Sequence, residues 1–231
     1  IVLRQQVEDS LNRLQKQNYI ARNGDIYQFL TDEEQDIARE ISNQNIDASA
    51  VISQVCKTIF DDIYTTKKYR YSKNDYNLDF DFDKTVDSQN HGNTTGGMKL
   101  RFVTEAFDDA SDLKLIADSK GYEAICKLST DYKIFNDIEN ALKIDKFIKQ
   151  KNVNQLPESI QAIITNKQKE ARRLLSEAKD KISEAIVHGK FYIDGEIMSI
   201  PGTSVKTVLD KALETLVEHT YSGITLIDTP V

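Results

Sequence analysis

The sequence contains no tryptophan and, in 231 residues, only two cysteines, three prolines and three histidines. Cys56 and Cys126 lie far apart, and neither belongs to a Cys-x-x-Cys pair, which argues against a disulfide framework or a cysteine zinc site. We expect both to be buried, reduced thiols. No apolar run approaches the roughly 18 residues of a membrane span, and the first residues lack the layout of a signal peptide. We therefore expect a cytoplasmic protein without a membrane contact.

Catalytic patterns are also missing. The three histidines, His91, His188 and His219, are isolated from one another and from any serine or cysteine in a nucleophile-like context, so no triad can be proposed. We expect them to be structural or exposed.

The glycine loop of residues 92–97 begins like a phosphate-binding P-loop, with Gly92 and Gly97 at the required spacing. Met98 stands where the phosphate-binding lysine belongs, and Lys99 is followed by Leu100 instead of the Ser or Thr that holds magnesium. The segment also leads into a predicted strand rather than a helix. A connecting loop is therefore predicted here, and a nucleotide site is not.

Charge is unevenly distributed along a chain whose net charge is −7. Residues 32–64 hold eight acids against Arg39 and Lys57, whereas residues 1–31 hold four bases against three acids. With 39% hydrophobic and 29% charged residues, the chain has the balance of a globular protein. Any nucleic-acid surface must be local, because the whole chain would repel a phosphate backbone.

Residues 1–31 predict a partial winged helix. Leu3, Val7, Leu11 and Leu14 recur at helical spacing, and an Asn23-Gly24 turn then joins two short strands. Helix, hairpin and strand form the closing half of a winged helix, which would need two more helices before it. Since the chain also begins without methionine, we expect it to be a piece of a longer polypeptide.

Lys16, Arg22 and Asn23 are the candidate nucleic-acid contacts. They lie at the end of the expected recognition helix and on the wing, where winged helices meet groove and phosphate. A protein contact is the alternative for this element, because Asp25 sits beside Arg22.

Residues 32–64 predict a long acidic connecting helix. Thr31 and Glu34 form a capping box at its start, and the helical spacing of apolar residues continues almost to Tyr64, with room for a break around Asn43–Asn45.

Residues 65–152 predict a small α+β lobe with an antiparallel or mixed sheet and packed helices. Lys67–Tyr71 mixes bases with aromatics as single-strand binders do, although an exposed loop is the simpler interpretation. Alternation from Tyr76 to Asp83 predicts a half-buried strand. Further strands are expected at Lys99–Thr104, Leu113–Ala117 and Ala124–Leu128, followed by a helix that Thr130 or Asp131 can cap.

Three carboxylates of the alternating strand, Asp79, Asp81 and Asp83, suggest a calcium loop at first sight. Such a loop requires Gly where Lys84 stands and Glu where Asn90 stands, so no EF-hand is present. A solvated edge strand that resists unwanted pairing is the expected role of the carboxylates.

Residues 153–231 predict a helix–hairpin–helix lobe. A long helix opens at Leu156-Pro157, a hairpin turns at Asp194-Gly195, and a last helix covers Val205–Val217. The whole chain is thus predicted to be α+β.

Several stretches resemble the central part of the large P-loop proteins of bacterial BREX phage-defence systems, the BrxC and PglY family. They are Tyr27–Ile41 (YQFLTDEEQDIAREI), Leu128–Asp131 with the helix of Ala141–Ile148 (ALKIDKFI), and Phe191–Gly195 (FYIDG). The resemblance implies an AAA+-like ATPase parent that binds ATP and magnesium near its N-terminus and works with a PglZ-type protein and a methyltransferase. It also leaves open an oligomer of the parent. The family's ATPase motifs match no position of this sequence.

These observations lead to three hypotheses. The first is a non-catalytic regulatory or assembly segment of a BREX-type ATPase, with neither cofactor nor metal of its own. The second is a DNA-contacting winged-helix module of the same machine, which depends on Lys16 and Arg22. The third is a free-standing enzyme with a metal or nucleotide site near residues 79–99.

Overall fold

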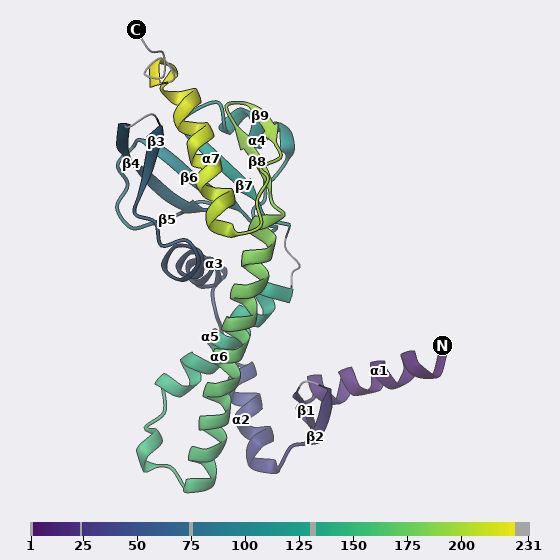
Figure 1. Cartoon of the computed structure of the whole chain (residues 1–231). Coiled ribbons are helices and arrows are strands. Elements are labelled where there is room, and N and C mark those ends of the chain that lie inside the picture. Colours follow the sequence, from purple (N-terminus) through teal and green to yellow (C-terminus); the bar gives the residue numbers. More distant parts are fainter. Residues whose placement is uncertain (1, 24, 74–75, 130–132, 225–231) are drawn as a thin grey trace. The chain divides into compact units, whose positions relative to one another are not determined.

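A computed structural model describes residues 2–23, 25–73, 76–129 and 133–224 (Figure 1). The chain forms two compact units. The helical unit comprises Ile1–Ile46 and Glu139–Leu174, and the sheet unit comprises Asp47–Ile138 and Leu175–Val231. Helices and strands both contribute, which confirms the α+β class. The division of the chain into four successive parts stays a prediction.

The helical unit begins with a helix and a hairpin, as predicted. Its elements are α1 (Val2–Lys16), β1 (Ile20–Asn23), β2 (Ile26–Phe29), α2 (Asp32–Ser42), the second part of α5 (Lys133–Lys149), the 3-10 turn η2 (Val153–Gln155) and the first part of α6 (Glu158–Val187). β1 and β2 are antiparallel, with Ile20 opposite Phe29 and Asn23 opposite Ile26. Gly24 of the predicted turn, and the caps predicted at Thr130 or Asp131, lie outside the described residues.

The connector predicted over residues 32–64 consists of two helices, and the break between them includes Asn43–Asn45, where the sequence left room for one. The capping box is present: Thr31 Oγ1 accepts a hydrogen bond from Glu34 N at 3.3 Å, and Glu34 Oε2 accepts one from Thr31 N at 2.8 Å. α2 ends at Ser42, and α3 (Ala48–Lys57) begins in the other unit before continuing into the π-helical turn η1 (Thr58–Ile63). The break falls on Asn-Gln-Asn-Ile-Asp, where short polar side chains compete with the helix for backbone hydrogen bonds.

A mixed sheet forms the centre of the sheet unit. Within the described residues it has seven strands, namely β3 (Lys68–Lys73), β4 (Tyr76–Val86), β5 (Gln89–His91), β6 (Met98–Val103), β7 (Glu123–Lys127), β8 (Lys190–Ile193) and β9 (Glu196–Met198). Their order is β3-β4-β6-β7-β8-β9, and β5 pairs with β4. β4, β6 and β7 run parallel, and the other pairs are antiparallel. The predicted mixed sheet is thus confirmed, although the hairpin β8–β9 belongs to it through β7.

Two local predictions are wrong. The expected loop at Lys67–Tyr71 is strand β3, in which Tyr69 and Tyr71 are buried and alternate with exposed bases at the strand period of two. The strand expected at Leu113–Ala117 is helix α4 (Asp112–Asp118). Its Ser111 cap accepts a hydrogen bond from Lys114 N at 3.4 Å, and this cap decides between two periods that the short apolar run fits equally well.

The carboxylates of β4 do not line an exposed edge, because β4 has paired neighbours. Asp79 Oδ1 lies 2.9 Å from Arg70 Nε, and Asp81 Oδ2 lies 3.2 Å from Lys68 Nζ, both across the β3–β4 pair. Asp83 is 4% exposed and accepts hydrogen bonds from Thr95 N, Thr95 Oγ1 and Gly96 N at 2.5, 2.9 and 3.0 Å. Burial raises the pKa of Asp83, but these hydrogen bonds outweigh it and hold the pKa below the ordinary value. Through these hydrogen bonds Asp83 fixes the position of the glycine loop of residues 92–97, which connects β5 to β6.

Helices cover both faces of the sheet. α7 (Val205–Thr220) buries an apolar stripe on the face that carries Tyr71, whose hydroxyl lies 3.2 Å from Glu218 Oε1 of α7. α4 covers the opposite face, where Leu115 packs with Val103, Ile125 and Tyr192. Both cysteines are free and buried, as predicted. In the part of the chain that the structure describes, no helix is long and apolar enough to cross a bilayer.

Candidate functional site

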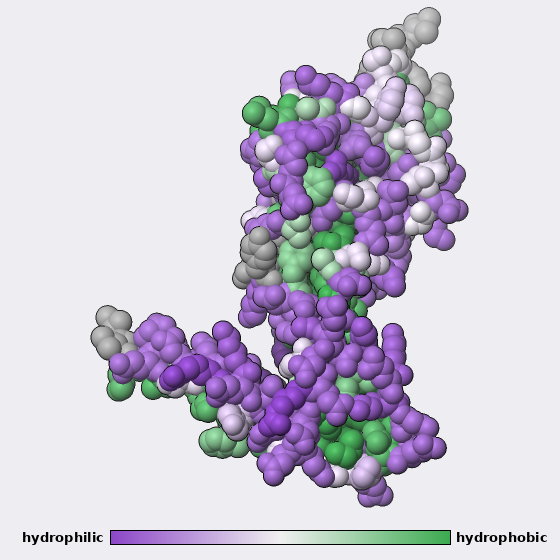
Figure 2. All heavy atoms as spheres, turned by 180° about the vertical axis from the view of Figure 1, so that it is seen from behind, coloured by the Kyte–Doolittle hydropathy of each residue, from purple (hydrophilic) through white to green (hydrophobic). Residues whose placement is uncertain are grey.

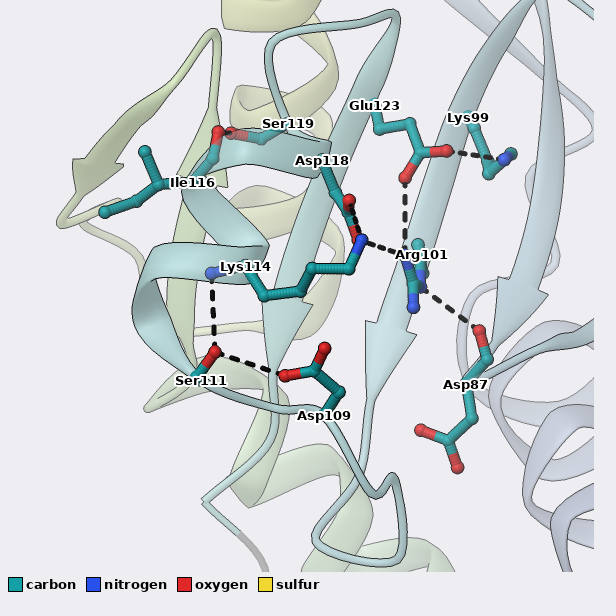
Figure 3. Close-up of polar contacts among 10 residues, drawn as sticks. All are labelled: Asp87, Lys99, Arg101, Asp109, Ser111, Lys114, Ile116, Asp118, Ser119 and Glu123. Carbon is teal, nitrogen blue, oxygen red and sulfur yellow. Dashed lines mark hydrogen bonds and ion pairs between the residues drawn. The ribbon is translucent and has the colours of Figure 1, made fainter.

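Charged side chains gather around Arg101 of β6, on the sheet face that α4 covers (Figure 3). The Arg101 side chain is 12% exposed, and its Nη1 lies 3.2 Å from Asp118 Oδ2 and 3.7 Å from Glu123 Oε2. Its Nε donates a hydrogen bond to the backbone oxygen of Asp87 at 3.1 Å. The guanidinium also lies 5.0 Å from the centre of the Phe107 ring. One side chain therefore joins β6 to α4, β7, the end of β4 and the loop after β6.

Two lysines complete this cluster. Lys99 Nζ lies 2.5 Å from Glu123 Oε1, and Lys114 forms an ion pair with Asp118 one helical turn away. Glu123 Oε2 is buried and has no hydrogen-bond donor among the described residues, so its compensation comes from the charge of Arg101. Each carboxylate in the cluster thus faces at least one cation.

Asp87 directly follows the carboxyl end of β4 and binds Thr104, which directly follows the carboxyl end of the parallel strand β6. Its carboxylate accepts hydrogen bonds from Thr104 N and Thr104 Oγ1, both at 2.8 Å, and the residue is 7% exposed. Burial raises the pKa of Asp87 above its ordinary value, against the opposing effect of these hydrogen bonds. Open α/β sheets bind ligands at such strand ends. Here the polar groups at that edge bind each other.

Asp112 holds the other end of α4. Its Oδ2 lies 2.5 Å from Lys190 Nζ of β8, and its Oδ1 accepts a hydrogen bond from the Tyr192 hydroxyl at 2.6 Å. The hydrogen bonds from Lys190 and Tyr192 lower the pKa of Asp112 to about 2. Since Asp118 binds Arg101, α4 is attached to the sheet by a carboxylate at each end.

The histidines stay apart, as the sequence indicates. His91 Nε2 lies 2.9 Å from Asp61 Oδ1, and His219 Nδ1 lies 3.0 Å from Asp194 Oδ2. Among the residues with described positions, no group of three or more His, Cys, Asp or Glu side chains is arranged to hold a metal ion.

The predicted nucleic-acid residues lie on two elements. Lys16 is exposed at the end of α1, and at 100° per residue it points away from the stripe of Leu3, Val7, Leu11 and Leu14. Arg22 of β1 lies 3.7 Å from Asp25 Oδ1, with its guanidinium 5.5 Å from the Tyr27 ring centre. Asn23 ends β1, and its side chain lies outside the described part of the structure.

An exposed apolar surface on α1 and the hairpin is a feature that sequence reasoning missed. Leu3 is 75% exposed, Val7 50% and Phe29 82%. We call these three side chains the apolar face. Phe29 points to the same side of the hairpin as the buried Ile20, its direct partner across the strands. Figure 2 shows apolar atoms along one side of α1 and the hairpin. The apolar stripe of α1 was the signal available in the sequence. It continues beyond the half-buried Leu11 and Leu14 by at least a full helical turn, to the exposed Val7 and Leu3.

Comparison with known families identifies the chain. Residues 44–216 match the family model described as "BREX ATP-binding protein BrxC 4th domain with six-stranded beta sheet". The match spans the whole mixed sheet, whose continuous order β3-β4-β6-β7-β8-β9 has six strands among the described residues. The chain belongs to the BrxC family and is thus a component of a BREX phage-defence system. No solved structure matches it.

We predict that Arg101→Met lowers the free energy of unfolding by about 3 kcal/mol, because it removes the cation beside Asp118 and beside the buried Oε2 of Glu123, which has no hydrogen-bond donor among the described residues. Arg70→Met is the matched control, since the Arg70 side chain is 66% exposed and water screens its pair with Asp79, so a much smaller loss is expected. Urea titrations of both variants measure the difference. Equal losses would contradict the central role of Arg101.

We also predict a specific acid sensitivity from Asp112. Its pKa is lower in the folded chain than the ordinary 3.8, so its pairs stabilise the fold above pH 3.8, and this contribution is lost as the pH falls through about 2. Asp112→Asn should therefore lower the melting temperature at pH 6 and flatten its decline between pH 4 and pH 2. Calorimetry of both proteins over this range tests the prediction, and parallel pH profiles would refute it.

Proposed function

We propose that this chain is a non-catalytic regulatory and assembly segment of a BREX ATPase. The observation that carries the proposal is the mutual pairing of charged groups in the sheet unit. Arg101, Asp112 and Asp87 fix the helix α4 and the strand ends, in the positions where an enzyme of this architecture would keep reactive groups available. In our proposal these ion pairs and hydrogen bonds keep the sheet unit rigid.

A rigid body of this kind suits mechanical coupling. In our proposal the parent is an AAA+-like cytoplasmic ATPase that binds ATP and magnesium in other segments, and this chain transmits its nucleotide state to a PglZ-type protein or a methyltransferase. The description of the family as ATP-binding supports the ATPase parent. The glycine loop supports a site elsewhere, because Asp83 occupies the Thr95 and Gly96 amides that a phosphate would need.

A second candidate is DNA contact through a winged helix formed in part by α1, β1 and β2. The order of helix and antiparallel hairpin agrees with the closing half of such a domain. Lys16 favours this candidate further, because it lies on the polar side of α1, opposite the side that would pack inside the domain. Arg22 then occupies the wing.

The assembly proposal predicts a complex. Purified chain mixed with the PglZ-type protein and the methyltransferase of the same BREX system should give a species of summed mass by multi-angle light scattering. Arg101→Met should weaken this complex near its own melting temperature, since coupling requires the rigid sheet unit. Separate elution of all three proteins at micromolar concentrations would argue against the proposal.

The DNA candidate predicts salt-dependent binding. Fluorescence anisotropy with a labelled duplex should show an affinity that falls with salt, each neutralised phosphate contributing about 0.9 to the logarithmic slope. Lys16→Ala with Arg22→Ala should remove most of that dependence, whereas Lys206→Ala, an exposed lysine of α7, should not. An unchanged slope in the double variant would eliminate this candidate.

A further inference from the structure

We propose that Lys84 of β4 is a modification site, whose side-chain amine accepts the acyl group of an acyl phosphate. Lys84 is half-buried in the sheet unit, on the same face of the sheet as Tyr71 and α7. The inference goes beyond the proposed assembly function and does not depend on it, because it concerns the reactivity of one side chain.

Lys84 stands among apolar side chains of the sheet. Since side chains alternate between the two faces of a strand, Lys84 shares its face with Phe82 and Val86, which are both buried. Its partner on the parallel strand β6 is the fully buried Leu100. These three neighbours exclude water from the amine and offer it no polar contact in return.

Two aromatic rings lie beside the amine. Nζ of Lys84 is 5.5 Å from the ring centre of Phe60 on η1 and 5.4 Å from that of Phe82. Such rings attract an ammonium group, but they bring neither a full charge nor a strong hydrogen-bond acceptor. Within the described residues, Lys84 forms no ion pair. All the other lysines of the described strands do so, namely Lys68, Lys73, Lys99, Lys127 and Lys190.

The carboxylate whose charge acts on Lys84 has another partner. Asp61 Oδ1 lies 2.9 Å from Nε2 of His91, and Asp61 acts on Lys84 only through its field. His91 is the direct partner of Lys84 on β5, and its ring stacks on that of Phe60 at 5.5 Å. The side chains of Asp61 and His91 are 56% and 25% exposed. A small molecule therefore reaches the amine from the side of these two residues.

These surroundings favour the neutral amine, which is the form of lysine that attacks an electrophile. Removal of water from Nζ lowers the pKa of Lys84, the charge of Lys67 lowers it further, and Asp61 opposes both effects. A lysine in apolar surroundings and near a second cation is the arrangement that activates nucleophilic amines.

The same surroundings favour acyl transfer over other modifications. Acylation yields a neutral amide, whereas methylation keeps the charge that the apolar neighbours disfavour. An acyl phosphate fits because Lys67 acts on the site as a cation and attracts the phosphate. The neutral Nζ forms a bond to the acyl carbon, and the bond from that carbon to the phosphate oxygen breaks. Phosphate leaves with the electron pair of that bond, and the surplus proton on the nitrogen passes to water.

Acetylation of the whole folded chain by acetyl phosphate at neutral pH tests the inference, with mass spectrometry following each lysine separately. We expect Lys84 to react at least about threefold faster than Lys68 and Lys206, although the side chains of these two are 56% and 73% exposed. A rate at Lys84 equal to theirs or lower would overturn the inference.

Two neighbouring carboxylates provide a matched pair of variants. Asp61→Asn should speed acetylation of Lys84 about threefold, because it removes an anion that stabilises the ammonium form. Asp62→Asn changes the next residue of η1, which is also exposed but does not shift the pKa of Lys84, and should leave the rate unchanged. The rate at Lys206 is the internal control for folding. Equal rates at Lys84 in the two variants would contradict the proposed site.

A third variant tests the choice of an acyl phosphate. Lys67→Gln should slow the reaction of Lys84 with acetyl phosphate by about threefold or more, since both the activation of the amine and the attraction of the phosphate are lost. Acetylimidazole, an acyl donor without a phosphate, should be slowed less. An equal effect of Lys67→Gln on both donors would refute the assignment of an acyl phosphate.

Discussion

The sheet unit depends on one guanidinium placed almost out of reach of water. A nearly buried Arg101 must satisfy a planar set of donors with acceptors fixed in position, so each element that supplies an acceptor is fixed in turn. The acceptors come from α4, β7 and the turn after β4, which are separated in sequence and joined here by a single charge. Asp112 then secures the far end of α4, and a seven-residue helix too short to be stable alone becomes a fixed part of the surface.

The two units use their side chains in opposite ways. In the sheet unit, the charged side chains of Arg101 and Asp87 are largely buried and bind neighbouring elements, and the apolar stripe of α7 is buried as well. In the helix and hairpin at the start of the chain, apolar side chains are directed outward, and most charges are paired only with near neighbours on the same helix. The first arrangement is typical of a rigid framework, whereas the second leaves apolar side chains of α1 and the hairpin exposed to water.

Sequence patterns identified the elements whose signals are local and complete. These were the capping box at Thr31, the hairpin turn at Asp194-Gly195, the long amphipathic helices, and the strands β6 and β7. They failed where the deciding partner is distant. The alternation of Tyr69 and Tyr71 in β3 is too short to predict a strand by itself, because it is the packing of the distant helix α7 that buries the tyrosines. Likewise, no local pattern indicates that Asp83 is buried while Asp79 and Asp81 are exposed. The Arg101 cluster was invisible for the same reason, since five separate segments build it. The spacing of Leu3 and Val7 predicts an apolar stripe on the first helix, but spacing alone does not predict which residues of the stripe are buried and which are exposed.

The chain passes between its two units three times, after Ile46, Ile138 and Leu174, and two of these passages fall inside the continuous helices α5 and α6. Neither unit can therefore be excised as one stretch of polypeptide. A single protease cut in residues 43–47 separates Ile1–Ile46 from its companion segment Glu139–Leu174 and leaves that segment attached to the sheet. Recombination between related genes meets the same restriction: an exchange with one crossover divides a unit, so the two must be inherited together.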